Sequence, residues 1–119
     1  VYLRVRLGKS GNLAASDVLK KSTCPVLYIQ GAEDKTVPPS AGRLSLEKDL
    51  KGKNNITYLT VPGRWHQCFL SIKSEEYINE LWDKKLTSPE GPIGLKMDLE
   101  TAGEENKELL QTIFDFLAV

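Results

Sequence analysis

The chain has 119 residues, enough for one α/β domain or for part of a larger one. Its 16 basic and 16 acidic residues balance, which argues against a nucleic acid or an anionic membrane surface as the partner. No apolar stretch approaches the roughly 18 residues of a membrane span, and no signal peptide is recognisable. We therefore expect no membrane span and a cytoplasmic location, where two cysteines stay reduced.

The first third of the sequence predicts two strands and a helix between them. Residues 1–7, VYLRVRL, alternate between apolar and polar side chains as a half-buried strand does. A helix follows from Leu13 to about Ser22, with two lysines near its carboxyl end. Residues 25–30, PVLYIQ, are apolar on both sides, which predicts a strand that is covered on both faces.

The middle of the chain repeats the pattern of helix and strand. Residues 41–52 predict a helix that Ser40 caps and Gly52 ends. The β-branched and aromatic run from Ile56 to Val61 predicts a second buried strand. The order strand, helix, strand, helix predicts an α/β fold, with adjacent parallel strands and helices on the faces of the sheet.

Two further helices are predicted in the last third, with a long loop between them. Residues 74–85, SEEYINELWDKK, begin with a suitable N-cap in Ser74 and carry acidic residues in the first turn. A loop or insertion is expected from about 86 to 103, and residues 104–119 form the most amphipathic helix of the chain. We treat residues 1–119 as a single domain or as part of one.

Two polar residues follow the two buried strands at equal distances from a glycine. Asp34 lies three residues after Gly31, and His66, the only histidine, lies three residues after Gly63. Parallel neighbours about 4.8 Å apart end at the same edge of a sheet, so the carboxylate and the imidazole can meet there. Taken singly, the aspartate is an ordinary turn former and the histidine an ordinary loop residue. As a pair, they suit an acid that orients a general base.

The segments "CPVLYIQGAEDKTVPPS" and "ITYLTVPGRWHQ" resemble the carboxyl-terminal half of an α/β-hydrolase. In that family a strand delivers the triad acid in a G-x-x-D-x-x-V-P setting, and the next strand delivers the triad histidine. The resemblance implies that Asp34 is the acid and His66 the base of a serine hydrolase acting on carboxylic esters or related acyl substrates. It implies no cofactor and no metal.

The nucleophile of that family has no counterpart in this chain. The family's serine lies in a G-x-S-x-G elbow that precedes the acid and the histidine, whereas Ser10, in "GKSGN", has Asn12 where the last glycine belongs. We expect the serine to come from an upstream segment or a second chain, and the isolated chain to be inactive. The start at Val1 fits a processed product or a fragment.

Other interpretations stay open. A non-catalytic α/β module that serves folding or protein interaction is the main alternative. Trp65 either borders an acyl pocket or packs beneath its loop. Cys68 with His66 would make a thiol dyad only if the thiol were activated, and nothing in the sequence indicates that. One histidine and two cysteines show no zinc spacing, and the glycines form no phosphate loop.

Overall fold

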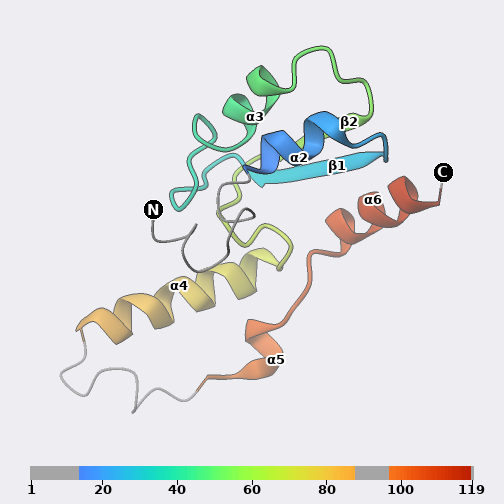
Figure 1. Cartoon of the computed structure of the whole chain (residues 1–119). Coiled ribbons are helices and arrows are strands. Elements are labelled where there is room, and N and C mark those ends of the chain that lie inside the picture. The colour runs from blue at the N-terminus through green and yellow to red at the C-terminus, as the bar shows by residue number, and fades with distance from the viewer. Residues whose placement is uncertain (1–13, 88–96, 119) are drawn as a thin grey trace, which may run out of the picture.

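The computed structural model describes residues 14–87 and 97–118. Figure 1 shows α3 above the sheet and α4 and α5 below it. The strand predicted for residues 1–7 and the turn around Ser10 lie outside the described residues. The elements in chain order are α2 (Ala15–Lys21), β1 (Val26–Gly31), α3 (Arg43–Asp49), β2 (Ile56–Val61), α4 (Ile72–Thr87), α5 (Leu99–Ala102) and α6 (Lys107–Leu117).

β1 and β2 are adjacent and parallel, which confirms the predicted pairing. Val26 lies opposite Ile56, and the register continues to Gly31 opposite Val61. The pairing extends one residue further, because the Ala32 N–H donates to the Val61 carbonyl at 2.9 Å. The result is a mixed α/β structure with a two-stranded parallel sheet and flanking helices, and the loops after both strands leave from the same edge.

The two strands are less covered than their apolar sequences predict. In β1 only Gln30 and Gly31 are fully buried, and in β2 every position is half-buried except Thr57, which is exposed. Parallel sheets are normally covered on both faces by helices. Within the described residues the helices therefore cover only part of this sheet.

Two of the predicted helix caps, Ser40 and Ser74, are wrong. α3 begins at Arg43 after Gly42, and no side chain caps it, so Ser40 does not have the predicted role. α4 begins at Ile72, two residues before the predicted cap Ser74. The Ser71 hydroxyl accepts a hydrogen bond from the Ser74 N–H at 3.0 Å, which is the contact that an N-cap side chain makes with the third helical residue.

The predicted loop from 86 to 103 is partly helical. Residues 86 and 87 belong to α4, residues 88–96 lie outside the described residues, and α5 is a single turn. The Asp98 carboxylate caps α5 by accepting from the Glu100 N–H at 3.1 Å. The predicted last helix is present as α6, but it begins at Lys107, three residues after the predicted start. The Asn106 side chain caps it by accepting from the Leu109 N–H at 3.2 Å.

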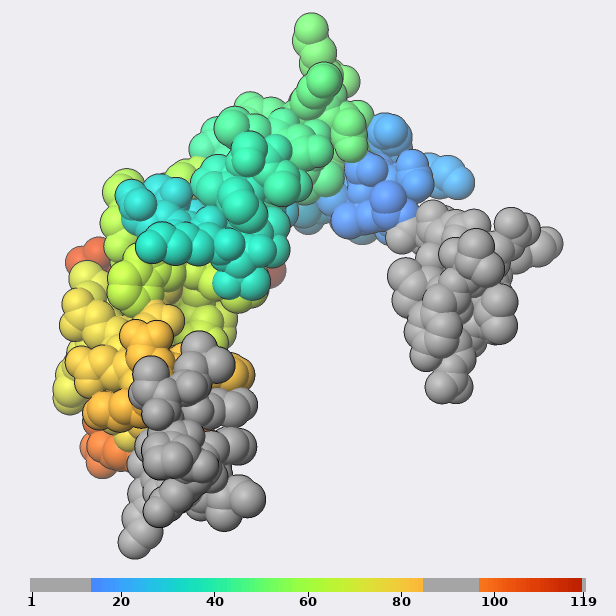
Figure 2. Space-filling model, turned by 90° about the vertical axis from the view of Figure 1, so that its left-hand side faces the viewer, coloured from blue at the N-terminus to red at the C-terminus, as the bar shows by residue number. Residues whose placement is uncertain are grey.

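Few apolar side chains are buried in the part of the chain that the structure describes. The fully buried ones there are Leu50, Cys68 and Leu109, whereas Phe114 and Leu117 on α6 are exposed. Figure 2 shows the described residues as a curved band, with α3 in green near the top and α4 in yellow and orange below. None of the described helices is long and apolar enough to cross a membrane.

Candidate active site

Asp34 lies in the loop after β1 with its side chain only 5% exposed. Its Oδ1 atom accepts hydrogen bonds from the N–H groups of Thr36 and Val37, each at 2.9 Å. This is the local turn that an aspartate after a strand commonly makes. These two hydrogen bonds use Oδ1 and fix the orientation of the carboxylate group. Oδ2 takes no part in the turn and can accept from another partner.

Oδ2 of Asp34 meets the histidine that follows β2. The distance from His66 Nδ1 to Asp34 Oδ2 is 2.8 Å. In the Nδ1–H tautomer the ring donates this proton to the carboxylate, and Nε2 carries a lone pair. The His66 side chain is 52% exposed. The parallel pairing of the strands thus brings these two side chains together, as the sequence predicts.

The surroundings of Asp34 favour its charged form. Burial by itself raises the pKa of this carboxyl group. Hydrogen bonds from the Val37 N–H, from His66 and from the Thr36 N–H, together with the charge of His66, outweigh burial and bring the pKa below its ordinary value. An ionised carboxylate is the form that can orient an imidazole and stabilise an imidazolium.

Backbone contacts hold the two loops against each other. The Glu33 N–H donates to the Arg64 carbonyl at 2.8 Å. A Cβ atom at Gly31 would overlap the backbone carbonyl oxygens of Arg64 and Trp65. Gly63 has φ +65°, a left-handed conformation that glycine adopts without strain. Because Gly31 has no side chain, the loop after β2 can approach it closely. Gly63 permits the turn at the start of the loop after β2.

Gln30, at the end of β1, supports the Asp34 loop from inside. Its Nε2 donates to the Val37 carbonyl at 2.6 Å, and its Oε1 accepts from the Arg43 N–H at 2.8 Å. The side chain is buried, and it links the loop after β1 to the start of α3. Sequence reasoning placed Gln30 only as the last residue of a strand. The only sequence feature that could have indicated its role is the glutamine itself, at the end of an otherwise apolar run.

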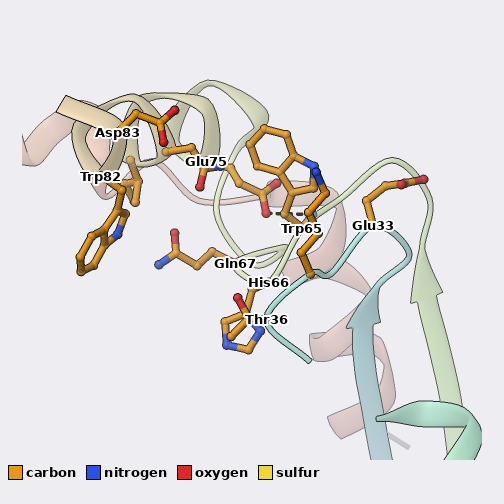
Figure 3. A pocket seen from close by; sticks show the side chains of 11 residues that line it. Glu33, Thr36, Trp65, His66, Gln67, Glu75, Trp82 and Asp83 are labelled. Carbon is orange, nitrogen blue, oxygen red and sulfur yellow. Dashed lines mark hydrogen bonds between the residues drawn. The ribbon is translucent and has the colours of Figure 1, made fainter. Parts of the chain in front are cut away.

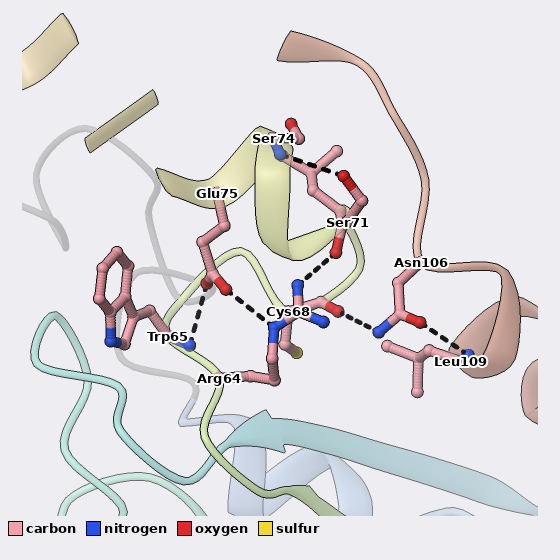
Figure 4. A network of polar contacts seen from close by, with 9 residues as sticks. Arg64, Trp65, Cys68, Ser71, Ser74, Glu75, Asn106 and Leu109 are labelled. Atoms are coloured by element: carbon pink, nitrogen blue, oxygen red, sulfur yellow. Dashed lines mark hydrogen bonds and ion pairs between the residues drawn. The ribbon is translucent and has the colours of Figure 1, made fainter. Parts of the chain in front are cut away.

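A buried ion pair supports the His66 loop from the other side (Figure 4). Arg64 Nε lies 2.9 Å from Glu75 Oε2, and the two side chains are 8% and 5% exposed. Glu75 Oε1 accepts from the Trp65 N–H at 2.9 Å. A second Arg64 nitrogen donates to the Leu70 carbonyl. Sequence reasoning missed this role, because an acidic residue in the first turn of a helix is typical of exposed positions.

An open groove of about 610 Å³ adjoins His66. Its volume lies within the usual range of about 300–1,000 Å³ for small-molecule sites. In Figure 3, Trp65 and Trp82 lie on two sides of it, with His66 and Gln67 between them. The residues that line the groove are Glu33, Lys35, Thr36, Trp65, His66, Gln67, Glu75, Ile78, Asn79, Trp82 and Asp83.

The structure places Trp65 and Cys68, the two other residues near His66 that the sequence analysis considered. Trp65 is 39% exposed and lines the groove, so it does not pack beneath its loop. Cys68 is buried, and burial raises the pKa of its thiol; the neighbouring Glu75 adds to this and Arg64 opposes it. A thiol kept in its protonated form is a weak nucleophile, so a dyad of Cys68 and His66 is disfavoured.

Within residues 14–87 and 97–118, Asp34 is the only hydrogen-bond partner of the His66 ring. Across the same residues, no cluster of three or more His, Cys, Asp or Glu side chains has the arrangement of a metal site. The described site thus contains an oriented imidazole with an accessible outer face, beside a groove.

Comparison of the chain with protein-family models, with curated proteins and with solved structures finds no match.

Proposed function

We propose that this chain is the carboxyl-terminal part of a serine hydrolase acting on carboxylic esters or related acyl substrates. Asp34 is the acid and His66 the base of its Ser-His-Asp triad, and the serine lies outside this chain. The observation that carries the proposal is the 2.8 Å contact between Asp34 Oδ2 and His66 Nδ1, in a histidine whose side chain is half exposed.

The geometry of the pair suits base catalysis at one defined nitrogen. Asp34 holds the Nδ1 proton, so Nε2 is the basic atom. Nε2 takes the proton of a serine hydroxyl as the serine oxygen attacks the acyl carbon, and later returns it to the departing alcohol. The ring is positively charged between these two steps, and the Asp34 carboxylate stabilises that charge. A second cycle, with water in place of serine, releases the acid.

The groove beside His66 is the proposed position of the substrate. Trp65 and Ile78 provide apolar surface, while Gln67 and Asn79 provide amide groups that can accept or donate hydrogen bonds. Charged side chains, among them Glu33 and Lys35, also line the groove. Such a mixed lining suits an acyl or alcohol group that carries polar atoms.

Chemical modification of the single histidine tests the base directly. Diethyl pyrocarbonate reacts with a neutral imidazole nitrogen, and the absorbance of the product reports His66 alone, because the chain has one histidine. Attack builds positive charge on the ring, which Asp34 stabilises. We expect Asp34→Asn to slow the modification of His66 about threefold or more.

The matched control is Asp49→Asn, a substitution of an exposed aspartate at the end of α3. It should leave the modification rate unchanged. Rates are compared at about pH 9, where imidazole side chains are neutral. Equal rates there in the wild type and in a folded Asp34→Asn variant would show that the carboxylate does not act on His66, and would refute the proposed triad.

A second candidate function is an interaction module without catalysis. The observation that favours it is the number of large apolar side chains on the surface, among them Phe69, Ile72, Phe114 and Leu117. Exposed apolar side chains can mark a surface that a protein partner covers. The modification assay separates the two candidates, because an interaction module has no need of a histidine that its neighbouring carboxylate activates.

A further inference from the structure

The buried ion pair of Arg64 and Glu75 has no part in the chemistry proposed above. Burying two opposite charges costs desolvation free energy, and such a pair often contributes little net stability. Both carboxylate oxygens of Glu75 are nevertheless used, one by the Arg64 guanidinium and one by the Trp65 N–H, each at 2.9 Å. The residue after Trp65 is the candidate base.

The backbone of residues 64 and 65 is held from two directions. On the side of β1, the Arg64 carbonyl accepts from the Glu33 N–H at 2.8 Å, and the absence of a side chain at Gly31 permits this approach. On the side of α4, the carboxylate of Glu75 holds the Trp65 N–H. Figure 4 shows Glu75 between Trp65 and Arg64.

The His66 ring depends on this backbone because packing restrains it little. Its side chain is 52% exposed, whereas that of its partner Asp34 is 5% exposed. Among the described residues the ring has one hydrogen-bond partner. The backbone of residues 64 and 65 helps to set the position of the His66 Cα atom, and that position affects whether Nδ1 reaches Asp34.

We infer that Glu75 is a positioning residue for His66: by holding the Trp65 N–H and the Arg64 guanidinium, it keeps His66 Nδ1 on Asp34 Oδ2. This role rests on the proposed function, in which Asp34 and His66 act as a pair. Glu75 acts through the loop and does not touch the reacting atoms.

Glu75→Gln is a sharp test because glutamine matches glutamate in size but cannot make both contacts. Its two terminal atoms face two donors, Arg64 Nε and the Trp65 N–H. In either orientation the amide NH₂ of glutamine faces one of these donors, so one of the two bonds is lost. The matched control is Glu76→Gln, which changes the next residue of the helix, an exposed one.

The readout is the tautomer of His66, from the ¹⁵N shifts of its ring nitrogens at about pH 9, where imidazole side chains are neutral. A ring held by Asp34 is the Nδ1–H tautomer, whereas a released ring also populates Nε2–H. A contribution of Glu75 to overall stability alone would not change this ratio in a folded protein. We expect Glu75→Gln to lower the ratio of Nδ1–H to Nε2–H about threefold or more, and Glu76→Gln to leave it unchanged.

Asp34→Asn separates the positioning role of Glu75 from the proposed function. If this variant leaves the tautomer ratio unchanged, the pair does not form, and both the function and the positioning role fail. If it changes the ratio while a folded Glu75→Gln variant does not, the positioning role alone is overturned.

The double variant Arg64→Met, Glu75→Leu covers the case in which Glu75→Gln does not fold. It removes both buried charges together and leaves apolar side chains of similar size, which buried ion pairs often tolerate. The Trp65 N–H loses its acceptor, so we expect the same fall in the Nδ1–H tautomer. An unchanged ratio in the folded double variant overturns the positioning role.

Discussion

Asp34 uses its two carboxylate oxygens for two different purposes. Oδ1 closes the turn after β1 by accepting from two backbone amides, while Oδ2 meets His66. The interpretation of Asp34 as a turn former and its interpretation as the partner of a histidine are therefore compatible. The turn fixes the carboxylate through contacts that do not involve the histidine.

The lowered pKa of Asp34 has a consequence for stability and its dependence on pH. A carboxyl group whose folded pKa lies below its unfolded value stabilises the fold fully above the unfolded pKa, about 3.9 for aspartate. That contribution is lost as the pH falls from there through the folded pKa. At pH 7 we expect Asp34→Asn to lower the free energy of unfolding by about 1–3 kcal/mol, and we expect the difference from wild type to shrink below about pH 4.

Urea unfolding at pH 7 and at pH 3 measures the loss of unfolding free energy in Asp34→Asn and its decrease at low pH. Asp49→Asn is the control at an exposed position. A deficit of Asp34→Asn that stays the same at both pH values would show that the charge of Asp34 does not contribute to stability.

The loops after β1 and β2 behave as one unit at the scale of elements. The Ala32 N–H donates to the carbonyl of Val61 at the end of β2, and the Glu33 N–H donates to the carbonyl of Arg64 in the loop after β2. The sheet pairing thus continues beyond the strand ends, into the segment that carries the candidate residues. The close approach depends on one residue without a side chain, Gly31.

Gly31→Ala is predicted to destabilise the contact between the loops after β1 and β2. The added Cβ would meet backbone atoms of Arg64 and Trp65, which cannot move aside as a flexible side chain could. Such overpacking typically lowers the free energy of unfolding by about 1–3 kcal/mol, and separation of the loops would also weaken the contact of His66 with Asp34.

Gly63→Asn is the control for a glycine in the second loop. Gly63 has φ +65°, and the space that an added Cβ atom would occupy is open; asparagine tolerates this conformation better than most residues. Urea unfolding and the His66 tautomer ratio, measured for both variants, check the prediction. A Gly31→Ala variant as stable as wild type, with an unchanged ratio, would contradict the close approach of the loops.

α4 connects the site to the last third of the chain. Its first turn carries Glu75, which holds the His66 loop, and Ser74, whose hydroxyl donates to the Ala102 carbonyl at 2.6 Å. The Asn106 side chain caps α6 and also donates to the Cys68 carbonyl at 3.0 Å. α5 and α6 are thus attached to the loop of the candidate base through a short series of polar contacts.

At the scale of the whole molecule, the described residues contain a site but little core. Both strands are mostly half-covered, and several large apolar side chains face solvent. Two strands alone are marginal as an independent sheet. The upstream segment that the proposed function requires would cover these side chains if it packed on the sheet.

The isolated chain is predicted to hydrolyse p-nitrophenyl acetate no faster than an equal concentration of free imidazole. A base lowers the barrier of acyl transfer mainly when a nucleophile lies within hydrogen-bond reach. Donors to the oxyanion are worth about 3 kcal/mol more. Ser10→Ala should therefore leave the rate unchanged.

Turnover should appear when the chain is mixed with, or joined to, a segment that carries G-x-S-x-G and completes the sheet. Loss of that turnover in His66→Ala is the control. Turnover by the chain alone that disappears in Ser10→Ala would instead assign the nucleophile to this chain.

The sequence by itself determined strands β1 and β2, their parallel pairing, the presence of the final helix and the meeting of Asp34 with His66. These follow from local rules: apolar runs predict strands, a helix between them predicts a parallel crossover, and parallel strands end at one edge. The tertiary structure alone decided the start of α4, the role of Gln30 and the burial of Glu75. A glutamate in a first turn has the same local pattern whether it faces water or a buried arginine, because its burial depends on Arg64, eleven residues earlier in the chain.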